Sequence, residues 1–408
     1  MTDHQRDQPQ GRYNVRWTPL KGFVALYAGQ YLFLGMQLPF FPGWLDERGF
    51  SAASIGWLTG GALCLRLLFA PAFAYRLESL ADPRTGMRGV TALLALLALC
   101  LLTPVPNSVV AVAAIGMLFL YGLLVPLSDT AVLRADRRGE LAYGRARGMG
   151  SFFFIVANLL GGWAISQGGD NVIVLWMAAA ALSAFIATLF LPREKGAGTG
   201  ADRPRPSLAL AAKLFRSRSF LLMLFASGLI QGSHATYYTF SELHWSALGY
   251  PSYLIGALWT TGVVTEIALL FYMKPLVTRL GPVALIGAGA VAAIIRWPIA
   301  GLSPPLAVLF VIQTLHALTF AATYAGTIEF IGRAVPDEYR TTAMTIVASL
   351  GIGAVTGLAA VVAGQMFSAE APLYAYLLMS GMGGAALILT VLLGRRWDGG
   401  PLHAVAQD

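Results

Sequence analysis

Residues 109–127 read VVAVAAIGMLFLYGLLVPL and include no charged side chain. As an α-helix, this run and its neighbours rise about 1.5 Å per residue, which is enough to cross ~30 Å of hydrocarbon. Similar runs recur along the 408 residues, which are 57% hydrophobic and only 12% charged. Soluble domains carry about 25% charged residues. The sequence therefore predicts an all-α integral membrane protein and excludes a cytosolic enzyme, a nucleic-acid-binding protein and a disulfide-stapled secreted domain.

Charged or Gly/Pro-rich breaks divide the chain into twelve candidate spans. They are expected at about 19–45, 52–77, 86–104, 108–133, 145–166, 171–191, 219–245, 252–273, 282–301, 305–331, 341–367 and 371–394. With this count, 25 of the 28 Lys and Arg residues fall on one side of the membrane. Cytoplasmic loops are enriched in Lys and Arg, so both termini are expected in the cytoplasm. The net charge of +8 is thus explained without a nucleic-acid partner.

A polar break separates two groups of six spans. Residues 192–206, PREKGAGTGADRPRP, are typical of a flexible linker, and LALAAKLFRSR (208–218) can form a short amphipathic helix at the membrane surface. We therefore expect bundles at 1–191 and 219–408, joined by a cytoplasmic linker at 192–218. The segments GFSAASIGWL (49–58) and GYPSYLIGAL (249–258) match at an offset of 200 residues. Two parallel six-span halves predict a transporter whose site lies between them near the middle of the membrane.

The first 20 residues contain no apolar core of a signal peptide, so the first span is expected to be retained. Cys64 and Cys100 both fall inside apolar runs. We expect them to be small buried side chains rather than disulfide or metal ligands.

Ionisable residues within the spans are the main candidates for function, because a charge in the hydrocarbon costs several kcal/mol unless it faces a partner or a cavity. Five lie near the middle of their spans, two near the cytoplasmic ends of spans 4 and 5, and two near other span ends. They are Arg66, His234, Glu266, Arg296 and His316, then Asp129 and Arg147, then Glu242 and Glu329.

Arg66 and Glu266 are related by the same offset of 200 residues. If the repeat reflects a pseudo-two-fold axis, they occupy equivalent positions in the two bundles, facing each other near the cavity. The alternative is that Arg66 bonds to backbone carbonyls or extends towards the membrane surface.

Two further pairs are possible from position along the spans. Glu266 and Arg296 lie on neighbouring spans, and their pairing would be either a structural tie or a proton-coupling element. Asp129 and Arg147 are placed to form a cytoplasmic gate or a tie. If both pairs form, Arg66 is left without an acidic partner, which favours an anionic ligand. A small organic carboxylic acid carried with a proton is the predicted substrate.

The most polar span is the seventh, QGSHATYYTFSELHW (231–245). Its rings and hydroxyls suit an aromatic or sugar-like ligand, although a belt of aromatic residues at the membrane interface explains Trp245 equally well. His234 and His316 have no neighbouring Cys, His or Asp in the sequence, so hydrogen bonding in the cavity is favoured over metal binding, with helix packing as the alternative. The corresponding residues of span 1 are Gln30, Tyr31 and Gln37.

The chain resembles the major facilitator superfamily and, within it, the phenylpropionate permease family of proton symporters. The segments that carry the resemblance are LVPLSDT (124–130), YGRARGMGS (143–151), QGSHATYYTFSELHW (231–245), GALWTTGVVTEI (256–267), IIRWP (294–298) and QTLHALTF (313–320), with Arg66 in span 2. The resemblance implies a multi-pass transporter of the bacterial inner membrane, with no cofactor besides the coupled proton and no metal. The expected substrate-binding residues are Arg66, His234, Tyr237, Tyr238, Gln30, Gln37, Trp259 and Gln313.

More distantly, the spacing of acids, arginines and a histidine is similar to that of galactoside–proton symporters. By this resemblance the proton-coupling residues are Glu266, Arg296, His316, Asp129 and Arg147, with Glu242 as a further candidate. Those carriers have a glutamate three residues after the histidine, whereas this chain has Thr319. Proton transfer is therefore expected to move to Glu266, with Asp129 or Glu242 as alternatives. The loop RLESLADPRTGMR (76–88) also departs from the superfamily's signature.

The predicted function is a monomeric proton symporter that imports a small, aromatic carboxylic acid by alternating access. An efflux antiporter of the same fold and a nucleoside or sugar symporter remain alternatives. No HExxH motif or nucleophile–base pair is present, and no repeated filter motif, so an intramembrane enzyme or a channel is not expected.

Overall fold

The computed structural model describes residues 17–78, 80, 82–192 and 208–402. This part of the chain consists of α-helices and three π-helical segments, without a strand. The first group comprises α1 (Trp17–Gln37), α2 (Phe41–Glu47), α3 (Ala52–Glu78), α4 (Pro83–Cys100), α5 (Asn107–Arg137), α6 (Tyr143–Val156), η1 (Ala157–Gly161), α7 (Gly162–Gly168) and α8 (Asn171–Leu189).

The second group begins after the linker. It comprises α9 (Leu208–Arg216), α10 (Arg218–Gly232), α11 (Ala235–Ala247), α12 (Ser252–Phe271), α13 (Met273–Gly301), α14 (Leu306–Thr314), η3 (Ala317–Ala322), α15 (Thr323–Ala334), α16 (Asp337–Ile346), η4 (Val347–Ala354), α17 (Val355–Met366) and α18 (Leu373–Arg396). The predicted short helix after the linker is confirmed as α9, whereas residues 193–207 of the expected linker lie outside the described residues.

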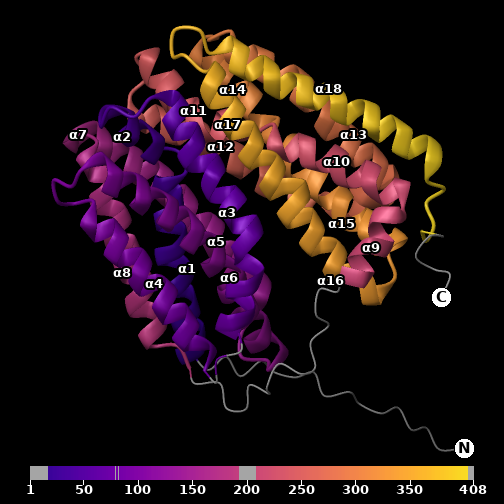
Figure 1. The fold of residues 1–408 in the computed structure, drawn as a ribbon, viewed down its shortest axis with the longest axis horizontal. Helices are drawn as coiled ribbons and strands as arrows, with labels where there is room; N and C mark the ends of the chain where they lie inside the picture. The colour runs from indigo at the N-terminus through magenta and orange to yellow at the C-terminus, as the bar shows by residue number, and fades with distance from the viewer. Residues whose placement is uncertain (1–16, 79, 81, 193–207, 403–408) are drawn as a thin grey trace, which may run out of the picture.

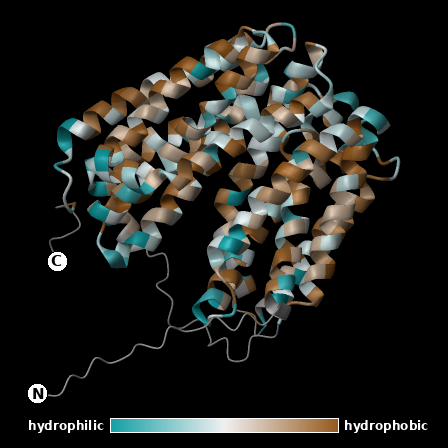
Figure 2. Cartoon of the chain, turned by 180° about the vertical axis from the view of Figure 1, so that it is seen from behind, coloured by the Kyte–Doolittle hydropathy of each residue, from teal (hydrophilic) through white to brown (hydrophobic). Residues whose placement is uncertain are grey.

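Nine helical segments of the described chain are long and apolar enough to cross a membrane. The other three expected spans correspond to α1 with α2, to α4, and to α10 with α11, which are interrupted or carry polar side chains. Figure 2 shows the apolar residues spread over the flanks of the helices, while polar residues concentrate near the helix ends. This distribution suits a protein surrounded by lipid.

The two groups of helices lie side by side and converge at one end (Figure 1). We call this end, where α2 and α11 meet, the distal face. We call the other end, where α8 ends and α9 begins, the linker face. Across the two groups, α3 packs on α17 and η4, α12 packs on η1 and α7, and α2 packs on α11. At the linker face the groups diverge, with α9 and α16 on one side and α4 and α6 on the other (Figure 1).

Glycines bring the two groups together near the distal face. A Cβ on Gly56 of α3 would lie 2.7 Å from the Ala360 carbonyl oxygen of α17 and 3.0 Å from Gly364 Cα. One turn further along, a Cβ on Gly60 would overlap the Gly357 carbonyl oxygen. Such close approach of two backbones is available only to residues without a side chain. We call this α3–α17 contact the glycine seam.

At the linker face, Asp82 begins α4. Its carboxylate accepts a hydrogen bond from the Arg84 backbone N–H at 3.0 Å and pairs with the Arg84 guanidinium at 2.6 Å. These bonds from Arg84 lower the pKa of Asp82 below its ordinary value. The guanidinium also donates to the Leu191 carbonyl oxygen at the end of α8. Asp82 and Arg84, which belong to the unusual segment 76–88, therefore fix the start of α4 against the end of α8.

Candidate functional site

Arg296 on α13 is completely buried, with 0% of its surface exposed. Its Nη2 donates to Gln313 Oε1 at 2.5 Å and its Nη1 donates to Thr319 Oγ1 at 3.1 Å. The Nη1 atom also lies 3.3 Å from Nδ1 of His316. No described carboxylate forms an ion pair with this guanidinium, and its buried Nε has no hydrogen-bond acceptor. Arg296 is thus a buried cation held only by neutral groups.

Aromatic rings cover the faces of this guanidinium. Arg296 Cζ lies 4.4 Å from the centroid of the Trp297 ring and 5.0 Å from that of Tyr237. The Tyr237 ring stacks on Trp259 of α12 with centroids 4.3 Å apart. Gln313 Nε2 donates to the Tyr237 hydroxyl at 3.1 Å, so one amide holds both the arginine and the tyrosine. The electron-rich faces of the rings stabilise this buried cation.

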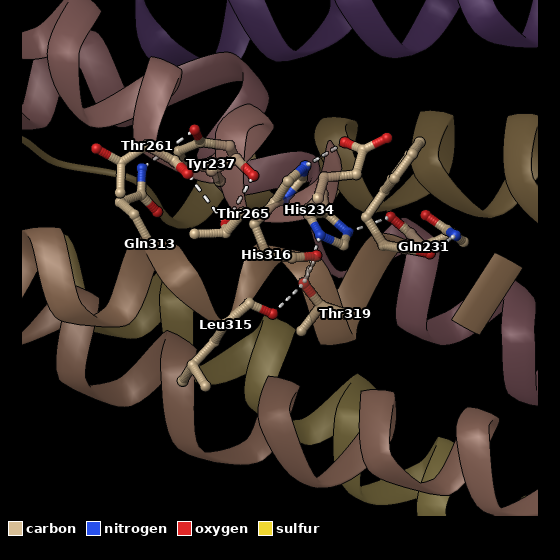
Figure 3. Close-up of polar contacts among 12 residues, drawn as sticks. Gln231, His234, Tyr237, Thr261, Thr265, Gln313, Leu315, His316 and Thr319 are labelled. Atoms are coloured by element: carbon tan, nitrogen blue, oxygen red, sulfur yellow. Dashed lines mark hydrogen bonds and ion pairs between the residues drawn. The ribbon is translucent and has the colours of Figure 1, made fainter. Parts of the chain in front are cut away.

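Two histidines and a threonine form the other side of the cluster (Figure 3). His234 Nε2 lies 3.0 Å from Thr319 Oγ1, and its Nδ1 lies 3.0 Å from the Gln231 carbonyl oxygen. The His234 and His316 rings meet edge to face with centroids 5.2 Å apart. Thr319 therefore contacts both His234 and Arg296. Both histidines thus lie in hydrogen-bonding contact with neighbouring polar groups, and their expected role in substrate binding and proton coupling stays a prediction.

A π-helical segment positions these residues. The span around residue 316 is interrupted where α14 ends at Thr314 and η3 begins at Ala317. π-Helical turns are rare and are frequent at functional sites, because the wider turn redirects side chains. Gly289 of α13 makes room for this turn, since a Cβ there would overlap Thr323 Oγ1. The turn thus presents His316 and Thr319 together to Arg296.

Glu266 contacts His316 rather than Arg296. Its Oε2 lies 3.7 Å from His316 Nε2, and its side chain is 22% exposed. The expected Glu266–Arg296 pair is therefore wrong for this conformation. The π-helical segment inserts His316 between the acid and the arginine, and Gln313 takes the acceptor position on Arg296.

The expected Asp129–Arg147 pair is also absent from the described structure. Asp129 accepts a hydrogen bond from the Tyr27 hydroxyl at 2.6 Å, and Arg147 lies over the Tyr31 ring with Cζ 5.0 Å from its centroid. The two tyrosines lie against each other with ring centroids 5.9 Å apart. They occupy the positions in which a direct ion pair was expected.

Arg66 lies on α3 beside α5, where its side chain fills the space left by Gly122. Among the described residues, none forms a hydrogen bond or ion pair with it. Nothing in the structure brings Arg66 together with Glu266, which contacts His316 within the second group. The expected opposition of these two residues thus stays a prediction.

The remaining expected binding residues lie in both groups of helices. Tyr238 stacks on His234 with centroids 5.3 Å apart. Gln30 accepts a hydrogen bond from Ser128 at 2.9 Å, while the buried Nε2 atoms of Gln30 and Gln37 have no described partner. Buried amide donors without an acceptor are available to a ligand or to water.

Glu242 lies near the distal face, in contact with the other group of helices. Its carboxylate accepts from Ser246 at 2.7 Å and fills the space above Gly43 of α2. On the α2 side, Glu47 and Asp170 share a hydrogen bond between carboxyl groups, which with partial burial raises the pKa of Glu47 to about 7. Glu242 is therefore part of the distal contact rather than of the Arg296 cluster.

Sequence reasoning missed the roles of Trp297, Tyr27 and Thr319. Trp297 covers Arg296 and donates from Nε1 to Ser233 at 2.9 Å. Its position next to a buried arginine was the available signal. Thr319 was noted only as the place where a glutamate is missing, and Tyr27 is one of several similar residues of its span.

Related proteins identify the family of this chain. Residues 18–378 match the model of the MFS_1 like family. A probable 3-phenylpropionic acid transporter of Escherichia coli (strain K12) is 28% identical over 318 residues, which cover 78% of this chain and 82% of that protein. A maltose permease of Geobacillus stearothermophilus is 24% identical over 336 residues, covering 82% of this chain and 83% of the permease.

The fold is similar to that of solved transporters. The crystal structure of the nucleoside transporter NupG covers 93% of this chain and 99% of its own, with a TM-score of 0.77 at 16% identity. That of a D-xylose–proton symporter covers 94% of this chain and 98% of its own, with a TM-score of 0.67 at 14% identity. The predicted all-helical, two-bundle fold is thereby confirmed. The chain belongs to the MFS_1 like family and is a multi-pass membrane transporter of the major facilitator superfamily, not an enzyme.

Proposed function

We propose that this transporter is a proton symporter that carries a small aromatic carboxylic acid across the bacterial plasma membrane. The observation that carries the proposal is Arg296, a fully buried guanidinium without a carboxylate partner among the described residues. A buried unpaired cation is costly, and a ligand carboxylate would remove that cost. Arginine also suits a carboxylate geometrically, because its planar donors match the two oxygens.

The surrounding rings support an aromatic substrate. Tyr237 and Trp297 lie against the guanidinium, and Tyr237 stacks on Trp259. A phenyl ring next to the carboxylate would pack against such faces. A probable 3-phenylpropionic acid transporter among the relatives agrees with this substrate class.

Glu266 and His316 are the proposed proton carriers. His316 lies between Glu266 and Arg296, 3.7 Å from the carboxylate and 3.3 Å from the guanidinium. A substrate anion at Arg296 would neutralise the arginine, and a proton on Glu266 would neutralise the acid. The loaded site would then carry no uncompensated negative charge through the membrane interior.

Alternating access follows from the arrangement of the two groups of helices. The glycine seam and the α2–α11 contact hold the distal face together, while the helices diverge at the linker face. If the Lys and Arg distribution places the linker face in the cytoplasm, this conformation faces inward. Rocking about the central site would open the distal face.

The test is uptake of labelled 3-phenylpropionate into proteoliposomes that contain the purified full-length protein. With the outside about two pH units more acidic than the inside we expect accumulation, which a protonophore abolishes. Arg296→Gln is expected to remove it. Labelled maltose, uridine and benzoate serve as comparison substrates.

Each other outcome assigns a different function. Accumulation driven by an acidic interior would identify an antiporter. Gradient-driven uptake of uridine but of no acid would identify a nucleoside symporter, for which the Tyr237–Trp259 stack could hold a base. The absence of gradient-driven flux for every acid would contradict the proposal.

A further inference from the structure

A groove of about 620 Å³ lies between α10 and α18, on the side of the second group of helices near the linker face. The two helices pack against each other along their lengths, and α18 forms the outer edge of the group (Figure 1). The walls of the groove are apolar and consist of Leu221, Leu222, Phe225, Leu389 and Leu392. From Arg218 to Phe225 the groove extends about 10 Å along α10.

Three arginines close the groove at the linker face. Arg218 begins α10, and Arg395 and Arg396 end α18. All three are exposed, and none forms an ion pair with any described residue. Arg395 and Arg396 also stabilise the negative, C-terminal end of the α18 dipole. This accounts for basic residues at the helix end but not for the apolar groove beside them.

A second hollow of about 400 Å³ adjoins the first and shares Arg218 and Arg396 with it. Arg216 adds another cation there, and Asp398 is the acidic residue among the lining groups. The side chain of Asp398 accepts from the Gly400 backbone N–H at 3.0 Å, so it is oriented towards its own turn. Four arginines against one aspartate leave the region strongly positive.

The C-terminal segment gives this second hollow a fixed wall. The Leu402 backbone N–H donates to the Ala334 carbonyl oxygen at 2.8 Å, and Leu402 is 5% exposed. Trp397 packs on Phe330 with ring centroids 4.5 Å apart and donates from Nε1 to Gly400. Residues 397–402 are thus folded back against α15 rather than extended.

We propose that this groove binds an anionic phospholipid, with one acyl chain between α10 and α18 and the phosphate among Arg218, Arg395 and Arg396. An apolar groove along two spanning helices, ending at the linker face in arginines that form no ion pair with described residues, matches the acyl chain and the phosphate of such a lipid. Basic clusters between spanning helices attract anionic headgroups. The bound lipid would join the first and last spans of the second group at the linker face.

Native mass spectrometry of the full-length protein, titrated with dioleoylphosphatidylglycerol or dioleoylphosphatidylcholine, tests the proposal. We expect dioleoylphosphatidylglycerol to bind roughly tenfold or more tightly than dioleoylphosphatidylcholine, because one to two arginines near the membrane surface attract its anionic headgroup. Arg218→Gln with Arg396→Gln should weaken it about 30-fold, equivalent to about 2 kcal/mol for two arginines. The matched control, Lys274→Gln with Arg279→Gln, removes two exposed charges at another part of the chain and should change binding less than about threefold.

A second pair of variants tests the apolar groove without changing charge. Leu389→Trp fills the groove, whereas Ile388→Trp adds the same ring at a position 63% exposed on α18. Only Leu389→Trp should reduce retention of the lipid, and thermal unfolding checks that both variants are folded. The proposal would be overturned if the double arginine variant and its control lost lipid affinity equally, or if the two lipids bound equally well. Displacement of the bound lipid by soluble glycerol phosphate would also overturn it. These results are independent of whether the transported substrate is an aromatic acid.

Discussion

Glu266 Oε2 on α12 lies 3.7 Å from His316 Nε2, at the point where α14 gives way to η3. The carboxylate thus meets a neutral or titratable base rather than the permanent charge of Arg296. The proposed protonation of Glu266 would leave the arginine bonded to Gln313.

Glu266→Gln is expected to abolish proton-driven accumulation of the substrate while leaving exchange of labelled for unlabelled substrate largely intact. The amide keeps the shape of the side chain but cannot bind and release a proton. Counterflow and gradient-driven uptake in proteoliposomes measure the two activities. Glu329→Gln, which removes an acid paired with Arg333 at 2.6 Å near the linker face, is the control. Loss of counterflow in Glu266→Gln would instead place the residue in substrate binding.

Arg296→Lys is expected to weaken binding of the aromatic acid about 10- to 100-fold, because a hydrogen bond to a charged group contributes about 1.5–3 kcal/mol. Lysine keeps the charge but loses the planar donors that meet Gln313 and Thr319. Scintillation proximity binding measures the change. Arg66→Gln is the comparison, because the Arg66 side chain lies against Gly122 of α5 and not in the Arg296 cluster. A larger loss in Arg66→Gln would transfer the anion-binding role to α3.

Gly60→Ala is expected to push the glycine seam apart and favour the conformation that is open at the distal face. A Cβ at Gly60 overlaps the Gly357 carbonyl oxygen, whereas a Cβ at the adjacent Gly61 meets nothing within 4 Å. Spin labels at the exposed residues 145 and 341, in a chain with Cys64→Ser and Cys100→Ser, report the width of the linker face. The label distance should shorten in Gly60→Ala and stay unchanged in Gly61→Ala. Unchanged distances in both would contradict the role of the seam.

Glu47 is expected to make stability fall as the pH rises from about 4.5 to about 7. Its pKa in the folded protein is raised to about 7 by the hydrogen bond with Asp170 and by burial. The folded state therefore holds its proton more tightly than the unfolded state, so folding is favoured at low pH and loses this contribution as the proton leaves. Exposure of Glu47 to solvent keeps the effect small.

Thermal unfolding of Glu47→Gln across the interval from about pH 4.5 to about pH 8 checks this expectation. The variant should have a flatter pH profile than the unchanged protein and a higher midpoint above about pH 7. Glu338→Gln, at an exposed position at the start of α16, should leave the profile unchanged. Parallel profiles for all three proteins would contradict the prediction.

The fold was predictable from the sequence because lipid imposes a simple length rule on apolar helices. The candidate site was predictable only in part of its membership. Ionisable residues inside the spans identified Arg296, His316 and Glu266, but sequence spacing could not establish which of them are in contact. A π-helical turn has no sequence rule comparable to the 3.6-residue period, and this turn places His316 between the other two.

The same difference explains why the expected direct ion pair of the first group of helices is not seen in this conformation. Asp129 and Arg147 were matched by depth and charge, yet each is satisfied by a tyrosine of α1. A hydroxyl and an aromatic face can replace an ion-pair partner at lower desolvation cost. Hydropathy does not distinguish such tyrosines from those at the membrane surface.

The neutral surroundings of Arg296 also bear on ion leakage. With Gln313, Thr319 and aromatic rings as its neighbours, the guanidinium keeps its full positive charge in a medium of low dielectric constant. A fixed positive charge of this kind repels sodium and hydronium ions, as arginines do in water-conducting pores. In the proposed symport, the empty carrier would thereby preserve the proton gradient that drives uptake.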